Sequence, residues 1–313
     1  MNEDTQNRCR SIAAHFYKTR INGIPTGKRV SDALKHCASE YRPDYWRSLR
    51  IALAFVAKED GFYKASDHIA ATKNPITSDA GRRSEIKKKQ NRQKSVNRAD
   101  EKQLLDYLLD NKEGVTFAAV TLVSYLGCRP AELKSLVFLD DQTILIPSAK
   151  QTANDDRGLD RIVFIERKSL FNSLKKSHDI FTKAPYTDPT RYVQRRLDTL
   201  TQRLWPQRKV RPSLYSWRHQ MGSDLKASDM NSAEIAAIMG HRSIESINVY
   251  GNRRSARSSR SYLTPTREIV KHVERINKHR LQSRSPKRTT FGGLTVEIQK
   301  RLGLAKYHNP KTP

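Results

Sequence analysis

The apolar residues of this chain follow a helical spacing over most of its length, and a short central stretch breaks that spacing. There the runs Thr143–Ile146 and Arg161–Ile165 are short, apolar and rich in β-branched residues, as strands are. The polar run Asn154–Gly158 between them supplies a turn. The sequence therefore predicts a mainly α protein in which one helical domain contains a small antiparallel sheet.

The first 73 residues are expected to form a helical domain. Three groups of apolar residues recur at helical spacing, and Pro43 stands where a helix can begin. The three groups are Ile12, Ala13, Phe16 and Tyr17; Val30, Ala33, Leu34 and Cys37; and Trp46, Leu49, Ala52, Leu53, Phe55 and Val56. A short fourth helix is expected at Asp67–Ala71, before Asn74-Pro75 breaks the pattern. We take residues 1–80 as the first domain.

A stretch of one charge sign, residues 81–96, separates this domain from the rest of the chain. Only Glu85 opposes its cations, and a run of like charge resists folding and favours a linker. A plain soluble connector remains an alternative, but the charge of the whole chain favours a linker that follows DNA phosphates. The predicted DNA-binding residues are Arg82, Arg83, Lys87, Lys88, Lys89, Arg92 and Lys94.

Residues 97–255 are expected to form a second domain of helices around the two strands. Its second helix, Val115–Leu126, is mostly apolar and therefore buried, and Gly127 ends it as a C-cap glycine does. Asn231 or Ser232 is the expected N-cap of a later helix. The other predicted helices carry Leu104, Leu105, Leu108 and Leu109, or span Lys168–Lys175, Pro189–Leu204, Trp217–Lys226 and Ser232–Met239.

The 63 residues after position 250 are strongly basic, with sixteen Lys or Arg against three Glu. A helix is expected over Thr266–His279, with Ile269, Val270, Val273 and Ile276 on one face. From Ser283 onward the sequence indicates a basic tail with a short helix at Thr295–Leu302. We assign residues 256–313 to a C-terminal helix and basic tail that contacts DNA or another protomer.

The net charge of the whole chain is +27, from 59 Lys+Arg and 32 Asp+Glu, with a pI near 10.2. Such a field indicates a polyanionic partner, and nucleic acid is the first candidate. No run of 18 apolar residues and no basic amphipathic anchor favours a membrane, and the polar opening Met1–Asp4 is unlike a signal peptide. Cys9, Cys37 and Cys128 are expected to be free thiols in a reducing cytoplasm.

A histidine and a tyrosine stand nine residues apart, at His241 and Tyr250, after a segment that contains Tyr215, Arg218 and His219. A tyrosine hydroxyl has a free pKa of about 10, so it attacks only where cations stabilise the transition state and a nearby group takes its proton. Guanidinium groups match the charged oxygens of a phosphodiester under attack. The candidate cations are Arg129, Lys150 and Arg218.

These residues resemble the catalytic domain of the tyrosine recombinases, the group of phage integrases and Xer-type recombinases. That family has an arginine in a Gly-x-Arg-x-x-Glu-Leu setting, a hairpin lysine, a His-x-x-Arg-His box and a Leu-Gly-His motif nine residues before the nucleophile. The matching positions, in chain order, are Gly127, Arg129, Glu132 and Leu133; Lys150; Tyr215, Arg218 and His219; and Met239, Gly240, His241 and Tyr250. The resemblance covers residues 97 to 255 and extends, more weakly, to a helical N-terminal core-binding domain.

The resemblance implies a site-specific DNA recombinase or integrase of a mobile genetic element. Tyr250 is expected to form a 3′-phosphotyrosine bond, with Arg129 and Arg218 holding the phosphoryl oxygens. Lys150 is then the general acid and His241 assists proton transfer. Glu132 orients Arg129, and His219 is structural or acts through another residue. No metal and no cofactor is expected.

One position departs from the family, because Tyr215 stands where the box has histidine or lysine. Tyrosine can donate a hydrogen bond to a phosphate oxygen but brings no positive charge at neutral pH. Alternatives to the other assignments also remain. Lys134, Arg157 and Arg161 compete with Lys150 as the hairpin cation, and Tyr250 is one of twelve tyrosines.

The expected partner is double-stranded DNA that carries recombination sites. By resemblance the chain acts as a homotetramer on DNA, a monomer or weak oligomer when free, with Thr266–His279 docking into a neighbour. Accessory DNA-bending or directionality proteins are expected, in the cytoplasm of a prokaryotic cell and associated with the nucleoid. The rival functions are a catalytically silent DNA-binding protein on the same fold, and a telomere resolvase or type IB topoisomerase.

Overall fold

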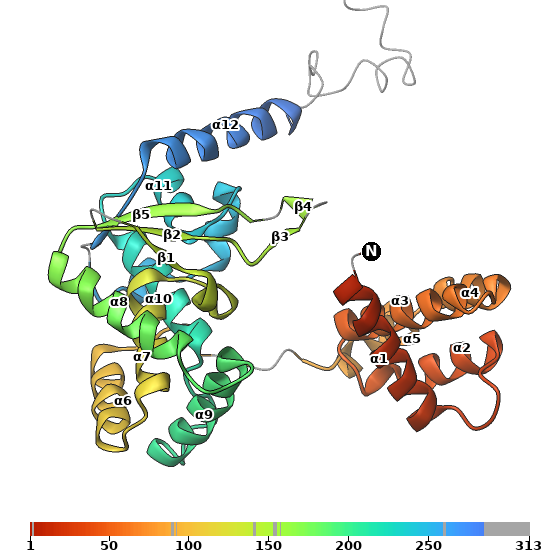
Figure 1. The fold of residues 1–313 in the computed structure, drawn as a ribbon. Helices are drawn as coiled ribbons and strands as arrows, with labels where there is room; N and C mark the ends of the chain where they lie inside the picture. The colour runs from red at the N-terminus through yellow and green to blue at the C-terminus, as the bar shows by residue number, and fades with distance from the viewer. Residues whose placement is uncertain are drawn as a thin grey trace, which may run out of the picture. The chain divides into compact units, whose positions relative to one another are not determined.

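A computed structural model describes residues 1, 3–88, 91, 93–139, 142–152, 155–156, 158–258 and 261–284. The chain divides into two compact units, of which the first is Met1–Asn91 and the second is the remainder. This division lies inside the stretch predicted to be a linker. Both units are drawn in Figure 1.

The first unit is wholly helical in the part that the structure describes, as the spacing of its apolar residues predicts. Pro43 begins one helix, and Asn74 caps another by accepting hydrogen bonds from the N–H groups of Ile76 and Thr77. The predicted fourth helix begins earlier than expected, at Tyr63. The elements are α1 Glu3–Arg20, α2 Gly27–His36, η1 Cys37–Ser39, α3 Pro43–Glu59, α4 Tyr63–Ala70, α5 Pro75–Ser78 and η2 Ala80–Glu85.

The core of this unit consists of the predicted apolar faces. Leu34, Trp46 and Leu53 are buried, and the indole N–H of Trp46 donates to the carbonyl of Leu34 at 2.8 Å. Ile86 packs against the same core, so the folded unit extends beyond residue 80 into the predicted linker.

The second unit surrounds its sheet with helices. Its elements are α6 Arg98–Asp110, α7 Gly114–Leu126, η3 Pro130–Ser135, α8 Lys168–Thr182, α9 Pro189–Leu204, α10 Leu214–Ala227, α11 Ser232–Met239, η4 Ile244–Val249, η5 Arg253–Ser255 and α12 Arg267–Arg284. The predicted boundaries of α9 and α11 are confirmed, whereas α8 continues to Thr182. α10 begins at Leu214 and not at Trp217, because the backbone N–H of Ser213 donates to Ser216 Oγ and closes its first turn. Tyr215 therefore lies within the helix.

The sheet has four antiparallel strands in the order β1-β2-β5-β6, which are Val137–Phe138, Thr143–Ile146, Arg161–Ile165 and Leu263–Pro265. The two predicted strands are its central pair, with Ile146 opposite Arg161. A separate ladder joins β3 Gln151–Thr152 to β4 Asp155–Asp156, so two residues predicted as turn are paired. In Figure 1 α11 and α12 lie on one side of the four-stranded sheet and α7 and α8 on the other.

The helix α7 is the centre of this unit, with Ala118, Ala119, Leu122 and Val123 fully buried. Gly127 follows it in the left-handed conformation, at φ 57°, as the predicted C-cap. All three cysteines are buried free thiols. Among the described residues there is no helix long and apolar enough to cross a membrane.

The helix α12 packs on its own unit. Val273 is fully buried in the core, and Ile269 and Val270 pack against that core. Asn277 accepts from the N–H of Ile244 and donates to the carbonyl of Arg242. The apolar face that the sequence suggests for docking into a neighbour therefore already has a partner in its own chain. The basic tail and the predicted helix Thr295–Leu302 lie outside the described residues.

Candidate active site

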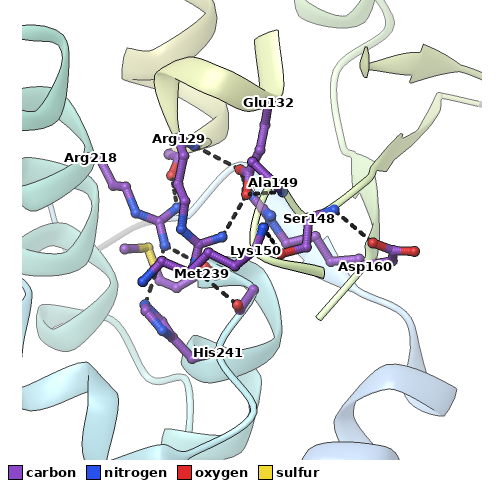
Figure 2. Close-up of polar contacts among 12 residues, drawn as sticks. Arg129, Glu132, Ser148, Ala149, Lys150, Asp160, Arg218, Met239 and His241 are labelled. Carbon is purple, nitrogen blue, oxygen red and sulfur yellow. Dashed lines mark hydrogen bonds and ion pairs between the residues drawn. The ribbon is translucent and has the colours of Figure 1, made fainter. Parts of the chain in front are cut away.

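Arg129 is the first of three buried arginines that meet where four separate parts of the chain converge (Figure 2). The left-handed turn at Gly127 redirects the chain out of α7, and Pro130 then starts η3. The Arg129 guanidinium pairs with Glu132 Oε1 at 2.5 Å and donates to the carbonyl of Gly240 at 3.3 Å. Its own backbone N–H donates to Glu132 Oε2 at 2.7 Å. Glu132, which the sequence predicts to orient Arg129, thus contacts both the side chain and the backbone of Arg129.

Glu132 is fully buried and binds a second arginine, Arg161, whose Nη2 lies 3.0 Å from Glu132 Oε2. Burial raises the pKa of the Glu132 carboxyl, but the charges of Arg161 and Arg129 outweigh that effect and bring it to about 2. Glu132 is therefore ionised at any physiological pH.

Arg218 is the third buried arginine and lies on α10. Its Nη1 donates to the carbonyl of Gly127 at 2.5 Å and its Nη2 to the carbonyl of Met239 at 2.6 Å. Burial, followed by the charges of Arg129 and Arg161, lowers the pKa of Arg218 to about 10. The group remains a cation at neutral pH.

His241 follows α11, which begins at the predicted N-cap Asn231 and ends at Gly240 in the left-handed conformation. Its Nε2 lies 3.3 Å from Arg218 Nη2. Since a guanidinium only donates, Nε2 accepts and the imidazole proton is assigned to Nδ1. Burial, followed by the charges of Arg218, Arg129, Arg161 and Lys150, lowers the pKa of His241 to about 2. The imidazole is neutral.

Tyr250 is half-buried at the end of η4, and its ring contacts these groups. The ring centroid lies 5.0 Å from Arg218 Cζ, and the rings of His241 and His219 each lie 4.9 Å from it. The segment rests directly on α10. A Cβ at Gly222 would lie 3.2 Å from Tyr250 Cβ, and a Cβ at Gly251 would lie 2.3 Å from the nitrogen of Ser223.

Lys150 and Tyr215 are both exposed, and Lys150 lies at the edge of the site. Lys150 follows β2 in a turn where its backbone N–H donates to Ser148 Oγ at 3.3 Å. The ammonium of Lys150 is close enough to contribute to the low pKa of His241. Tyr215 is 38% exposed and lies one turn before Arg218 on α10.

No protein-family model and no curated protein matches the sequence. Solved structures do match. A lambda integrase dimer bound to a COC′ core site aligns over 81% of this chain and 73% of its own, at 14% identity and a TM-score of 0.56. The Tn1549 transposon integrase in complex with circular intermediate DNA aligns over 80% and 90%, at 14% identity and a TM-score of 0.53. A lambda integrase tetramer bound to a Holliday junction aligns over 83% and 75%, with a TM-score of 0.54.

The chain has the fold of these integrases. The resemblance to tyrosine recombinases that the motifs indicate is therefore confirmed for the fold, including the small antiparallel sheet within a helical domain.

The charges of this buried site suit an anion. Within the described part of the chain, Glu132 is the only carboxylate paired with Arg129, Arg161 or Arg218, so one negative charge meets three positive ones. Buried charge without a counter-charge is unfavourable, and a bound anion supplies that counter-charge. No group of three or more His, Cys, Asp or Glu side chains among the described residues is placed to hold a metal ion.

The predicted DNA-binding cations are not equivalent in the structure. Arg82 pairs with Glu85, and Lys87 Nζ donates to the carbonyl of Glu40. Three others, Arg83, Lys88 and Lys94, are exposed. Lys89 and Arg92 lie outside the described residues.

The structure adds one charged residue that the motif series does not contain, Arg161. The sequence treats it only as a rival of Lys150. One signal was present: along β5 the positions of Val163 and Ile165 face the core, and Arg161 shares their alternation. A charge at an inward position of a strand needs a buried partner.

Proposed function

We propose that this chain is a site-specific DNA recombinase or integrase that cleaves and rejoins DNA through Tyr250. The observation that carries the proposal is the contact of the Tyr250 ring with Arg218 and His241 of the same chain, above a buried site with excess positive charge. Ring contact with a cation and a histidine is what distinguishes Tyr250 from a tyrosine that only fills a core.

The proposed step exchanges one phosphodiester for another. Tyr250 Oη attacks the scissile phosphorus, a 3′-phosphotyrosine bond forms, and the bond from phosphorus to the 5′-oxygen breaks. The phenol releases one proton to solvent and Lys150 gives one to the departing 5′-oxygen, leaving a 5′-hydroxyl. Attack of a 5′-hydroxyl on the phosphotyrosine reverses the step and rejoins a strand. The number of phosphodiester bonds is conserved, so no external energy source is needed.

The roles of the side chains follow from their positions. Arg129 and Arg218 hold the non-bridging oxygens, where negative charge grows in the transition state. The neutral His241 accepts from Arg218 at Nε2 and has its Nδ1 proton available to an oxygen. Lys150, exposed at the edge, donates the proton to the leaving 5′-oxygen. Tyr215, one turn before Arg218, supplies a hydrogen bond but no charge.

The charge of the site supports a phosphoryl substrate in particular. A phosphodiester carries one negative charge, and its pentavalent transition state concentrates further charge on the same oxygens. The excess positive charge of the guanidiniums therefore stabilises the transition state more than the ground state, and this difference is what accelerates a reaction.

Double-stranded DNA is the proposed partner, and a tetramer is the proposed working assembly. The net charge of +27 supports the first. The likeness in fold to integrases solved on DNA, including a tetramer on a Holliday junction, supports both. The cleavage chemistry and the tetramer are independent proposals, because a monomer could form the phosphotyrosine bond on DNA without assembling.

The proposal is tested by trapping the covalent bond. The purified chain is incubated with sheared genomic DNA of its source organism, denatured in detergent, and the DNA that stays attached to protein is sequenced. We expect enriched ends at a defined site. A duplex of that site with a nick just beyond the scissile phosphate then loses the short 5′-hydroxyl fragment, so cleavage is trapped.

Tyr250→Phe is the decisive variant, since it keeps the ring that packs on Arg218 and removes only the nucleophile. We expect it to bind the trapped site and to form no adduct. An adduct in Tyr250→Phe would exclude Tyr250 as nucleophile. Site-specific binding without any adduct from the unmodified chain would favour the catalytically silent DNA-binding protein.

A further inference from the structure

Arg161 is a buried cation that has no role in the proposed cleavage step as described so far. It begins β5, opposite Ile146 of β2, and its side chain is 0% exposed. The strands β2 and β5 also flank the turn that contains Lys150. Asp160, next in the chain, accepts from the N–H of Ser148 at 2.6 Å and holds that turn to the start of β5.

The contacts of Arg161 lead directly to Arg129. Arg161 Nη2 pairs with Glu132 Oε2, and the other carboxylate oxygen, Oε1, pairs with Arg129 Nη1. One carboxylate thus joins two guanidiniums, one on each oxygen. Figure 2 shows Glu132 with Arg129 on one side and Ala149 on the other.

Arg161 also lies against the backbone that precedes His241. A Cβ at Gly240 would lie 2.6 Å from Arg161 Nη1 and 3.3 Å from its Cζ, so the guanidinium lies directly against this glycine. The carbonyl of the same Gly240 accepts from Arg129 Nη2. Arg161 is therefore wedged between the carboxylate that orients Arg129 and the turn that positions His241.

Stability of the fold alone is a poor reason for this residue. A buried ion pair contributes little net stability, because its attraction mainly offsets the loss of hydration. In the described structure Arg161 Nε and Nη1 also have no hydrogen-bond partner, which is unfavourable for a buried group. An apolar side chain would fill an inward position of β5 at lower cost.

We propose that Arg161 is a positioning residue for strand cleavage, an inference that rests on the proposed function of the site. By occupying Glu132 Oε2 it leaves Oε1, which also accepts from the N–H of Ala149, to the guanidinium of Arg129 and fixes the plane of that guanidinium toward the scissile phosphate. It also fills the space beside Gly240, whose carbonyl accepts from Arg129 Nη2, so both contacts of Arg161 act on Arg129. Arg161 does not touch the phosphate.

The test uses single-turnover cleavage of the nicked site in full-length protein. We expect Arg161→Met to cleave about 100-fold more slowly, the scale of a misplacement of about 1 Å at a reacting centre. DNA affinity should stay within about threefold, because an inward group adds nothing to the phosphate contacts at the surface.

A double variant separates positioning from general damage. If Arg161 acts through Arg129, Arg129→Ala with Arg161→Met should cleave no more slowly than Arg129→Ala alone. Arg196→Met is the control, since it breaks another arginine–glutamate pair of the same unit, the partly buried pair with Glu113. It should cleave at the unmodified rate.

If Arg161→Met unfolds at the assay temperature, Arg161→Lys tests the positioning role instead. Its single ammonium keeps the charge beside Glu132 but not the planar fork, so cleavage should fall at least about 10-fold with little change in Tm. Unmodified rates in either folded variant, or losses that multiply in the double variant, overturn the inference. An unmodified chain that forms no adduct overturns the proposed function instead.

Discussion

At the scale of the residue, Lys150 differs from the three arginines in being exposed, and that difference suits a proton donor rather than a fixed clamp. A lysine at the edge can reach the leaving 5′-oxygen when DNA is bound. We expect Lys150→Ala to slow cleavage by about 10²–10⁴-fold, the usual contribution of a general acid. A 5′-bridging phosphorothiolate should restore the rate, because a thiol, with a pKa of about 8.5, leaves without being protonated.

Lys134 provides the control for this prediction. It is also exposed and close in sequence, but its Nζ donates to the carbonyl of Thr187, away from the site. Lys134→Ala should cleave both substrates at the unmodified rate. If the phosphorothiolate leaves Lys150→Ala slow, the acid is another group and Lys150 only binds.

His241 should also affect stability through its titration. Its pKa is about 2 when folded and about 6.5 when unfolded, so between these values the unfolded chain binds a proton that the folded chain does not. The contribution of His241 to the free energy of unfolding is therefore complete above pH 6.5 and is lost as the pH falls below 6.5. From pH 6.5 to 5 the free energy of unfolding should fall relative to His241→Gln, by up to about 1.4 kcal/mol per pH unit.

Urea unfolding at several pH values measures that difference. His68→Gln, an exposed histidine of α4, is the control and should follow the unmodified protein at each pH. Parallel curves for the unmodified chain and His241→Gln would mean that His241 binds its proton equally in the folded and unfolded chains, and its lowered pKa in the folded protein would be wrong.

At the scale of the element, the docking of the Tyr250 segment on α10 is the feature most open to test. Gly251 has φ +65°, and a Cβ there would lie 2.7 Å from Gly222 C and from His219 O. Gly251→Ala should therefore lift the segment from α10 and slow cleavage by about 100-fold without loss of DNA binding.

Gly61→Ala separates the close contact from the backbone conformation. Gly61 has a similar φ of +83°, but a Cβ there meets nothing within 4 Å. It should lose about 1 kcal/mol of stability from strain and no cleavage rate. Equal rates for the two variants would show that the close contact between Gly251 and α10 is not needed to place Tyr250.

Elements that depend on local chemistry can be predicted from the sequence, and those that depend on distant residues cannot. α11 lies between Asn231 and Gly240, and α7 ends at Gly127, because capping chemistry is local. The central strands were recognisable from their three and four consecutive apolar residues, Ile144–Ile146 and Ile162–Ile165. β6 has three residues, joins the sheet from 98 positions beyond β5, and has no local pattern. The alternation along β5 marks Arg161 as an inward residue, but it does not identify the partner, since Glu132 is 29 residues away.

At the scale of the whole molecule, the charge of +27 predicts DNA binding that weakens steeply with salt. The exposed cations of the predicted linker, Arg83, Lys88 and Lys94, should supply part of that dependence. Replacing all three by Gln should lower the slope of log affinity against log salt by about 3, because each phosphate that the protein no longer neutralises lowers it by about 0.9.

Charge removal elsewhere must be separated from this effect. Lys168, Lys175 and Lys176 are exposed on α8, and replacing them by Gln changes the net charge by the same amount. If the linker follows DNA phosphates, the α8 variant should keep nearly the full slope, because its lysines lie outside the predicted linker. Titrations of the trapped site at four or more salt concentrations measure both slopes. Equal reductions would mean that the predicted linker binds DNA only through the net charge of the molecule, as a plain connector would.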